Sequence, residues 1–280
     1  MGHGFYHNEY IRIGKGRKVN LLKEKKLFLL DMDGTIYLDN NLFPGVIEFL
    51  ENVKKRGGRY IFMTNNSSKG IESYIEKMRR LGIETTAEDY VTSVNVTAIH
   101  LAKKQYKKIY VFGTESFKAQ LRAANLPVCD TLSDDIDCLC VGFDTELTFK
   151  KLEDACILLG RGVDYVASHP DLVCPTAYGS VPDCGSVCDM LYNAMGRRPL
   201  VIGKPEPGMP LLAMEKTGFS KEQTIVLGDR IYTDIACGIR AGVDAVLVLS
   251  GEGTREDAEM AIEKPTYIYE DIAAFAKDVF

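Results

Sequence analysis

The sequence predicts an α/β protein with a doubly wound, Rossmann-like parallel sheet. Short apolar runs of the kind that form buried parallel strands alternate with amphipathic stretches of helical period along the whole chain. This repeated strand–helix order favours a parallel sheet with helices on both faces. With 280 residues, the chain has room for one large domain, or for a core with a second domain inserted or appended.

The first elements are clearly marked. The continuous apolar run Leu27–Leu30 predicts a central strand. Pro44 then opens a helical pattern, which a pair of glycines at 57–58 ends. The next strand is expected at Tyr60–Met63, and a helix around Ile71–Leu81 follows it.

Later apolar runs continue the same order. They predict strands at Ile109–Phe112, Cys138–Val141, Tyr165–Ala167, Thr224–Leu227 and Ala245–Leu249. The segment Ser168–Gly185 differs, because it is rich in Pro, Gly and Asp and carries few helix or strand signals. We expect a long loop there, and such loops are usually functional or disordered.

Composition argues against several classes of function. The net charge of −5 makes a nucleic-acid partner unlikely on electrostatic grounds. No apolar run approaches the ~20 residues that span a bilayer, so no membrane association is expected. The eight cysteines include no C-x-x-C pair and lie mostly in apolar runs, as buried thiols do in a reducing compartment.

The N-terminal segment carries no signal-peptide pattern, which favours a cytoplasmic protein. Met1–Lys18 is polar and basic, and we expect it to be partly disordered. Its histidines, His3 and His7, have no other ligand type nearby that would indicate a metal site.

A pair of carboxylates follows the first strand. Asp31 and Asp33 lie at its carboxyl end, where ligands bind in open parallel sheets, and Gly34 allows a sharp exit. Residues i and i+2 of an extended chain point the same way, so both carboxylates can reach one site if the strand continues through them. A hard divalent cation would neutralise them there. A surface turn or a calcium loop is the alternative, although the EF-hand pattern needs more oxygen ligands.

Two further motifs suit a phosphate. Thr64, Asn65 and Asn66 follow the strand at Tyr60–Met63 and precede a helix, whose N-terminal N–H groups can bind an anion. An ordinary helix cap is the alternative. Lys204 precedes a proline, on an extended segment, and its ammonium could neutralise phosphate charge. The alternative for Lys204 is a solvated surface side chain.

The fourth motif follows the strand Thr224–Leu227. Asp229 offers a third carboxylate at a strand end. Asp234 lies near the start of the next helix, where the dipole favours an acid. Arg230 either contacts substrate or forms a structural ion pair.

All four motifs follow predicted parallel strands, since the Lys204 motif comes just after the apolar run Leu200–Ile202. On these residues the chain resembles the haloacid dehalogenase (HAD) superfamily, and within it the NagD-type, p-nitrophenyl phosphatase-like branch. The resemblance covers roughly Lys26 to the C-terminus. The matching segments are Asp31–Thr35, Thr64–Ser67, Gly142–Asp144, Pro182–Gly185, Gly203–Pro205, Gly228–Asp234 and Val248–Gly251.

The resemblance implies a phosphatase that works through an aspartyl phosphate. Asp31 would attack phosphorus, and Asp33 would protonate the leaving oxygen and then activate water. Thr64 would hold a phosphate oxygen, with Asn65 and Asn66 beside it. Lys204 would offset the charge of the phosphate and of Asp31.

The resemblance also implies Mg²⁺ as the cofactor. It would be bound by Asp31, the carbonyl of Asp33 and Asp229, with Asp234 positioning its water molecules. The expected substrate is a small phosphate monoester, either a sugar phosphate or a nucleoside monophosphate. Phosphoglycolate and pyridoxal phosphate are alternatives. A phosphomutase or phosphonate hydrolase on the same core, or a non-catalytic binding protein, remain rival functions.

By the same resemblance, a smaller α/β cap is inserted in the HAD core. The implied division is an N-terminal extension at 1–25, a core at 26–104 and 197–280, and a cap at 105–196. The segment Ser168–Gly185 would face the substrate, with His169 and Asp171 contacting the leaving group. Relatives often have Asn where this chain has His169, and a packed or exposed loop histidine is the alternative for this residue. Relatives with this cap often dimerise through it, so a homodimer is expected.

Overall fold

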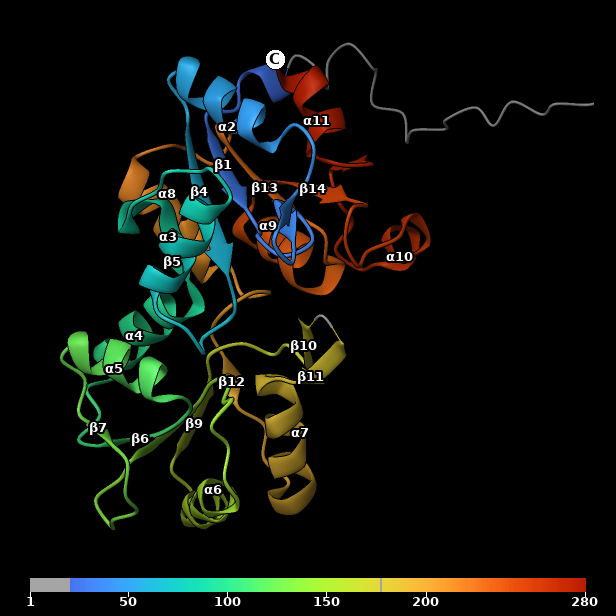
Figure 1. Cartoon of the computed structure of the whole chain (residues 1–280). Helices are drawn as coiled ribbons and strands as arrows, with labels where there is room; N and C mark the ends of the chain where they lie inside the picture. The colour runs from blue at the N-terminus through green and yellow to red at the C-terminus, as the bar shows by residue number, and fades with distance from the viewer. Residues whose placement is uncertain (1–20, 177) are drawn as a thin grey trace, which may run out of the picture.

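The computed structural model describes residues 21–176 and 178–280 (Figure 1). The predictions for Met1–Lys18, His3 and His7 therefore lie outside the described residues. Two parallel sheets, each flanked by helices, form the two parts of the molecule in Figure 1. Within the described ranges, no helix has both the length and the apolar composition required to cross a bilayer.

The larger sheet has six parallel strands in the order β15-β14-β13-β1-β4-β5. The central strand β1 pairs with β13 on one side and with β4 on the other, and its four residues are buried. Burial on both faces explains why this strand is apolar at every position. The bounds are β1 Leu27–Leu30, β4 Arg59–Thr64, β5 Tyr90–Thr92, β13 Thr224–Gly228, β14 Asp244–Val248 and β15 Tyr267–Tyr269.

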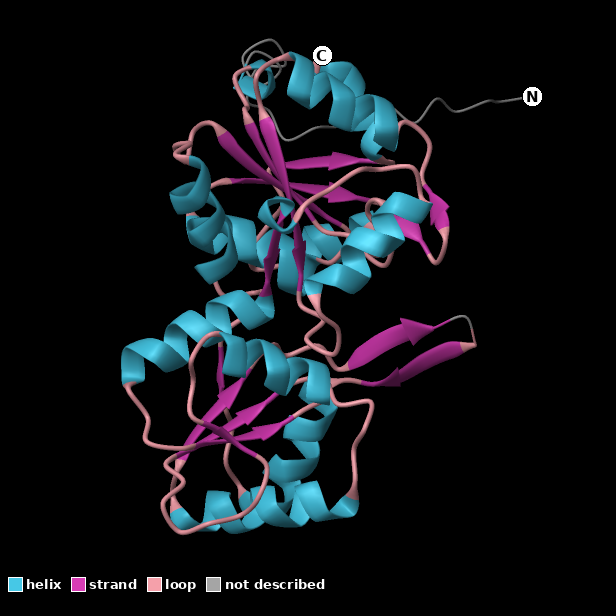
Figure 2. Cartoon of the chain, turned by 60° about the vertical axis from the view of Figure 1, so that its left-hand side comes forward, coloured by secondary structure: helices cyan, strands magenta, loops and turns pink. Residues whose placement is uncertain are grey.

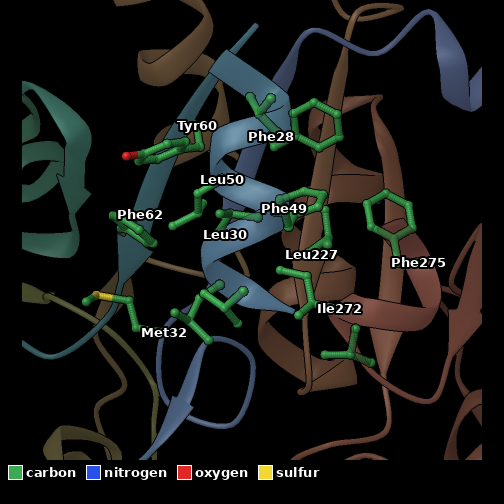
Figure 3. Packing of buried hydrophobic residues seen from close by; sticks show 14 of the residues in the cluster. Phe28, Leu30, Met32, Phe49, Leu50, Tyr60, Phe62, Leu227, Ile272 and Phe275 are labelled. Carbon is green, nitrogen blue, oxygen red and sulfur yellow. The ribbon is translucent and has the colours of Figure 1, made fainter. Parts of the chain in front are cut away.

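Helices cover both faces of this sheet, as predicted for a doubly wound fold. Phe28 of β1 packs edge-on against Phe49 at 5.3 Å between ring centroids, and near Phe275 (Figure 3). Leu27 and Leu29 of β1 pack in a separate buried cluster with Met209. The helices are α2 Val46–Lys55, α3 Ile71–Arg80, α4 Ser93–Lys104, α8 Gly208–Thr217, α9 Ala236–Ala241, α10 Arg255–Met260 and α11 Ile272–Val279, with short turns η1 Ala87–Asp89 and η2 Ile231–Ile235.

The second sheet has five parallel strands in the order β12-β9-β8-β6-β7. Its elements come between α4 and α8 in the sequence, so this α/β unit is inserted in the core, as the predicted fold requires. Strand β12 pairs with β9, which places Leu200–Val201 in the cap sheet although the predicted core resumes at 197. The elements are β6 Ile109–Phe112, α5 Glu115–Ala123, β7 Val128–Cys129, β8 Cys138–Val141, α6 Phe149–Arg161, β9 Asp164–Ala167, α7 Cys184–Met195 and β12 Leu200–Val201.

The prediction of a loop over Ser168–Gly185 is wrong for much of that segment. Strands β10 (Val173–Thr176) and β11 (Gly179–Pro182) form an antiparallel hairpin, and α7 begins at Cys184. The hairpin projects from the rest of the cap (Figure 2). Pro and Gly weaken the strand signal, but a two-stranded hairpin has only edge strands, and these tolerate proline.

Candidate active site

The polar motifs meet at one edge of the core sheet. Asp31 follows β1, Thr64 ends β4, and Asp229 follows β13. These three strands are neighbours in the sheet and run parallel, so their carboxyl ends lie side by side. The Asp31 N–H donates to the carbonyl of Leu227 at 2.9 Å, which keeps the chain against β13 just past the end of β1.

Lys204 lies at the centre of this edge. Its ammonium is 2.5 Å from Asp31 Oδ1 and 2.6 Å from Asp234 Oδ1, and the whole residue is buried. Burial alone would lower the pKa of Lys204, but Asp234 and Asp31 raise that pKa above its ordinary value. The ammonium therefore remains charged at the pH of the cell.

Three carboxylates surround this single cation. Oxygen atoms of Asp31, Asp229 and Asp234 lie within 4.8 Å of one another. Burial, and then the charge of Asp234, raises the pKa of Asp31 well above its usual range, although Lys204 opposes this. Burial and Asp234 also raise the pKa of Asp229 to about 6. Ionisation of three carboxylates beside one ammonium is therefore unfavourable, and a cation bound among them would relieve their mutual repulsion.

The backbone closes tightly around Asp229. A Cβ atom at Gly34 or at Gly251 would collide with its carboxylate, so glycine is required at both positions. The hydroxyl of Thr35 donates to Asp229 Oδ1 at 3.3 Å, and the Glu252 N–H donates to Oδ2 at 2.9 Å. The fixed, all-oxygen donor set fits a hard divalent cation such as Mg²⁺.

Asp33 does not join this cluster of carboxylates. Its side chain is 58% exposed, and its carboxylate accepts a hydrogen bond from Tyr37 at 3.4 Å and lies 3.6 Å from the Lys77 ammonium. Lys77 also lies over the Tyr37 ring. The expectation that both carboxylates point into one site fails here because β1 ends at Leu30. Asp33 already belongs to the turn into the short hairpin of β2 (Tyr37–Leu38) and β3 (Asn41–Leu42).

The loop after β4 is shaped by its own side chains. The hydroxyl of Thr64 accepts the Asn66 N–H at 3.2 Å. The Asn66 side-chain oxygen accepts from both the N–H and the hydroxyl of Ser68, at 3.0 and 2.7 Å. The Lys204 ammonium lies 3.4 Å from the carbonyl of Met63, the residue before Thr64. The contacts of Thr64 and Asn66 with phosphate stay predictions.

Asn65 contacts protein groups on all sides. Its side chain exchanges two hydrogen bonds with the backbone of Lys204, each at 2.9 Å, and also donates to Asp171 Oδ1 at 3.2 Å. The hydroxyl of Ser93 donates to its carbonyl at 2.6 Å. In this arrangement the side chain has no free donor for phosphate.

His169 and Asp171 are buried where the cap meets the core. His169 Nδ1 lies 3.4 Å from Asp171 Oδ2, and Nε2 lies 3.7 Å from Asp183 Oδ1. Burial would lower the pKa of His169, but the contact with Asp171 and the charge of Asp183 raise it above its ordinary value. Burial would raise the pKa of Asp171, but His169 holds it below its usual range. A contact with the leaving group would require these side chains to exchange partners.

Two more predicted residues can be placed. Arg230 forms an ion pair with Glu252 at 2.9 Å. Of the two alternatives given for Arg230, this is the structural ion pair and not the substrate contact. Asp234 accepts the N–H of Arg230 at 3.2 Å and so is fixed in the first turn after β13.

Sequence reasoning missed Lys77 and Tyr37 as neighbours of Asp33, since no spacing rule links a helix face to a turn on another element.

All eight cysteines lie in the described part of the chain, and none of them forms a disulfide there. This agrees with their interpretation as free thiols.

Comparison with known proteins identifies the family. The sequence matches the family described as haloacid dehalogenase-like hydrolase over residues 28–127, and the one described as HAD-hydrolase-like over residues 201–275. It is 30% identical over 252 residues to the acid sugar phosphatase of Staphylococcus aureus (strain USA300), which covers 90% of this chain and 96% of that protein.

Solved structures agree. The 4-nitrophenylphosphatase from Thermotoga maritima has a TM-score of 0.86 and 41% identity, covering 93% of this chain and 99% of that one. The glycerol phosphate phosphatase from Mycobacterium tuberculosis in complex with magnesium has a TM-score of 0.85 and 30% identity, covering 92% and 79%. The chain therefore belongs to the haloacid dehalogenase-like hydrolases, among the NagD- and 4-nitrophenylphosphatase-type proteins, and is a phosphatase.

Proposed function

We propose that the protein is a Mg²⁺-dependent phosphomonoesterase that acts on a small phosphorylated metabolite through an aspartyl phosphate on Asp31. One observation carries the proposal. The Asp31 carboxylate is held at the sheet edge against the buried Lys204 ammonium, within 4.8 Å of oxygens from Asp229 and Asp234. This arrangement offers a nucleophile, a cation for the phosphate and oxygen ligands for a metal in one place.

In the first step Asp31 attacks phosphorus, so that its bond to phosphorus forms while the bond to the leaving oxygen breaks. Asp33 gives a proton to that oxygen and later takes one from the attacking water. The Thr64 hydroxyl and the Lys204 ammonium hold the phosphoryl oxygens. Asp31, Asp229 and the Asp33 carbonyl would hold Mg²⁺, with Asp234 placing its waters; when bound, Mg²⁺ offsets the charge of phosphate and carboxylate.

Asp33 must turn from its present partners to take part. Its contacts with Tyr37 and Lys77 are long, and its side chain is largely exposed, so reorientation breaks no short hydrogen bond. Contacts of this kind in the free enzyme often change in the complex with substrate. This reorientation is part of the proposal.

The substrate class is proposed from the relatives and from the cap. An acid sugar phosphatase and a glycerol phosphate phosphatase are among the similar proteins, which favours a sugar phosphate or another phosphorylated alcohol, with nucleoside monophosphates next. Phosphoglycolate and pyridoxal phosphate are the alternatives.

The hairpin β10–β11 is the part of Ser168–Gly185 best placed to face the leaving group. Burial, the charge of Asp183 and then the charge of Asp33 raise the pKa of Cys174 in β10 to about 11.

A homodimer through the cap stays a prediction. Apolar side chains that are half exposed on the cap surface, such as Met190 of α7 and Leu172, suit such a contact. The cytoplasmic setting likewise stays a prediction.

Removal of the metal tests the proposed function. We expect EDTA to abolish phosphate release from nitrophenyl phosphate and MgCl₂ to restore it, because the three carboxylates would otherwise repel an incoming phosphate. The same phosphate-release assay on sugar phosphates, nucleoside monophosphates, phosphoglycolate and pyridoxal phosphate would rank the substrate classes. Full activity in metal-free buffer would contradict the role proposed for the carboxylates.

Substitution of Asp33 by Asn should depend on the leaving group. A sugar alkoxide needs a proton as it leaves, whereas nitrophenolate needs little help, so kcat should fall by roughly 10²- to 10⁴-fold for a sugar phosphate and much less for nitrophenyl phosphate in the first chemical step. Rapid-quench measurement of that step on both substrates makes the comparison. Lys77→Met is the matched control, because it removes the resting partner of Asp33 and leaves its carboxyl group. Equal losses on both substrates would argue against Asp33 as the acid.

A further inference from the structure

A ring of buried polar side chains joins the cap to the loop that follows β4. This junction ring consists of two core residues, Asn65 and Ser67, and three cap residues, His169, Asp171 and Asp183. Each is at most 6% exposed. Buried polar groups are costly unless they are paired, so their contacts restrict how this part of the fold can be arranged.

Asn65 is the member of the junction ring that touches the catalytic segment. Its amide N–H groups donate to the carbonyl of Lys204 at 2.9 Å and to Asp171 Oδ1 at 3.2 Å, while its oxygen accepts the Lys204 N–H at 2.9 Å. Both donors of the amide are used. The amide therefore fixes the Lys204 peptide groups on both sides, much as a neighbouring strand would, and ties them to the cap.

The approach of these segments is close. A Cβ atom at Gly203 would lie only 2.7 Å from Asn65 Oδ1 and 2.6 Å from the carbonyl of Ser168. The Gly203 N–H donates to that same carbonyl at 2.8 Å. The cap residue before His169 thus contacts the residue before Lys204 directly, and only glycine permits it.

His169 holds Asp171 in position for Asn65. Its two ring nitrogens face different carboxylates, with Nδ1 3.4 Å from Asp171 Oδ2 and Nε2 3.7 Å from Asp183 Oδ1. Among the described residues Nδ1 makes no hydrogen bond, so the contact with Asp171 is an ion-pair contact, which a charged imidazolium between the two acids would form. The raised pKa of His169 agrees with the charged form.

The junction ring closes back on the loop after β4. The hydroxyl of Ser67 lies 3.3 Å from His169 Nε2 and accepts the Phe143 N–H of the cap at 2.8 Å. Asn65 and Ser67 are two residues apart in one loop, so the loop is held by the cap at two points. Thr64, whose hydroxyl is expected to hold phosphate, immediately precedes the first of them.

We propose that Asn65, Asp171 and His169 are positioning residues through which the cap fixes the backbone of Lys204 and thereby the place of its ammonium. The inference rests on the proposed function, since it gives Lys204 the phosphate to neutralise. Every substrate shares the phosphoryl group, so these residues act equally on all substrates. A direct contact with the leaving group would instead act on some substrates and not on others.

A pair of near-isosteric substitutions tests this. Asn65→Asp places a carboxylate against Asp171 and removes both donors, so kcat should fall by roughly 10- to 100-fold on every substrate, the size of effect that a small misplacement of a catalytic group produces. Adding Asp171→Asn to this variant supplies an amide donor at position 171, which can donate to the new carboxylate at position 65. The N65D/D171N double variant should regain several-fold in kcat over N65D but not the full loss, because the donor to the Lys204 carbonyl is still missing; this partial recovery is a non-additive result.

The measurements are kcat and KM for nitrophenyl phosphate and the metabolite panel, and calorimetric binding of inorganic phosphate in Mg²⁺ buffer. D171N alone should weaken phosphate binding and lower kcat while leaving the ranking of substrates unchanged. It remains informative if N65D does not fold. Asp154→Asn is the control, because it alters another buried cap carboxylate, bonded to Tyr110 and Lys150, outside the junction ring. It should leave phosphate binding intact.

Additive effects of N65D and D171N would overturn the inference. So would a changed substrate ranking with unchanged kcat on nitrophenyl phosphate, which would assign Asp171 to the leaving group instead. Failure of the proposed function looks different, because the wild-type protein would then release no phosphate from any ester, while phosphate binding would still report on the junction ring.

Discussion

Replacement of Asp31 by Asn is expected to lower kcat by roughly 10⁴-fold or more, in the range found when a covalent nucleophile is removed. The amide is nearly the same size as the carboxylate but is a poor nucleophile and a poor ligand for Mg²⁺. The loss should be similar for nitrophenyl phosphate and for metabolites, since every substrate needs the same first step. Phosphate release by the purified variant, measured with saturating Mg²⁺, gives the comparison.

The same variant should not be less stable than the wild-type protein in metal-free buffer. The pKa of Asp31 is higher in the folded protein than in the unfolded chain, where it is about 4. When the pH rises above about 4, ionisation of Asp31 therefore lowers the stability of the folded state. The uncharged amide removes that cost, and Asp234 still pairs with Lys204. A melting temperature at or above that of the wild type would show that the activity is lost without unfolding. Retention of more than a few per cent of kcat by the folded variant would contradict the assignment of Asp31 as the nucleophile.

Lys204→Met is the second substitution with a large expected effect, on both activity and stability. It keeps an apolar stem of similar length but removes the cation between Asp31 and Asp234, which are 2.5 and 2.6 Å from it. Breaking a buried ion pair by removing one partner typically costs about 3–5 kcal/mol. In metal-free buffer the free energy of unfolding should fall more at pH 8 than at pH 5, because the pKa of Asp31 is raised by burial and by Asp234, so its carboxylate takes up a proton more readily at the lower pH. Urea unfolding at both pH values measures this.

Activity of Lys204→Met should fall by roughly 10²- to 10³-fold, as expected when one preorganised group that stabilises developing charge is lost. The K204M/D234N double variant separates the two effects, since it removes one of the stranded charges. It should recover part of the stability and none of the activity. A double variant that regained turnover would show that Lys204 acts only to balance Asp234.

Much of the core follows from the sequence because a buried parallel strand must be apolar at every position. The runs Leu27–Leu30 and Cys138–Val141 are strands with the predicted bounds. The carboxyl ends of neighbouring parallel strands share one edge, so motifs after β1, β4 and β13 had to meet there. The convergence of Asp31, Thr64 and Asp229 was therefore predictable without knowledge of any distance. The place of Lys204 was not, because it follows β12, which belongs to the cap sheet.

Contacts that depend on how segments far apart in the sequence pack could not be predicted in this way. The turn of Asp33 toward Lys77 depends on where β1 ends and on which face of α3 packs above it. The contact of Asn65 with the Lys204 backbone has no signal in spacing, since an asparagine before a helix is equally typical of a cap. The hairpin β10–β11 was missed because its prolines and glycines oppose strand propensity, whereas its pairing with a single partner strand tolerates them.

Trapping of the phosphoenzyme tests the central claim most directly. Wild-type protein mixed with substrate and Mg²⁺ is quenched within one turnover and treated with borohydride, which reduces an aspartyl phosphate to homoserine, and the peptides are then sequenced by mass spectrometry. We predict homoserine at position 31, only when substrate is present, and none at positions 33, 229 or 234. Turnover without any modified residue at position 31, or modification at another carboxylate, would contradict the proposal that Asp31 is the nucleophile.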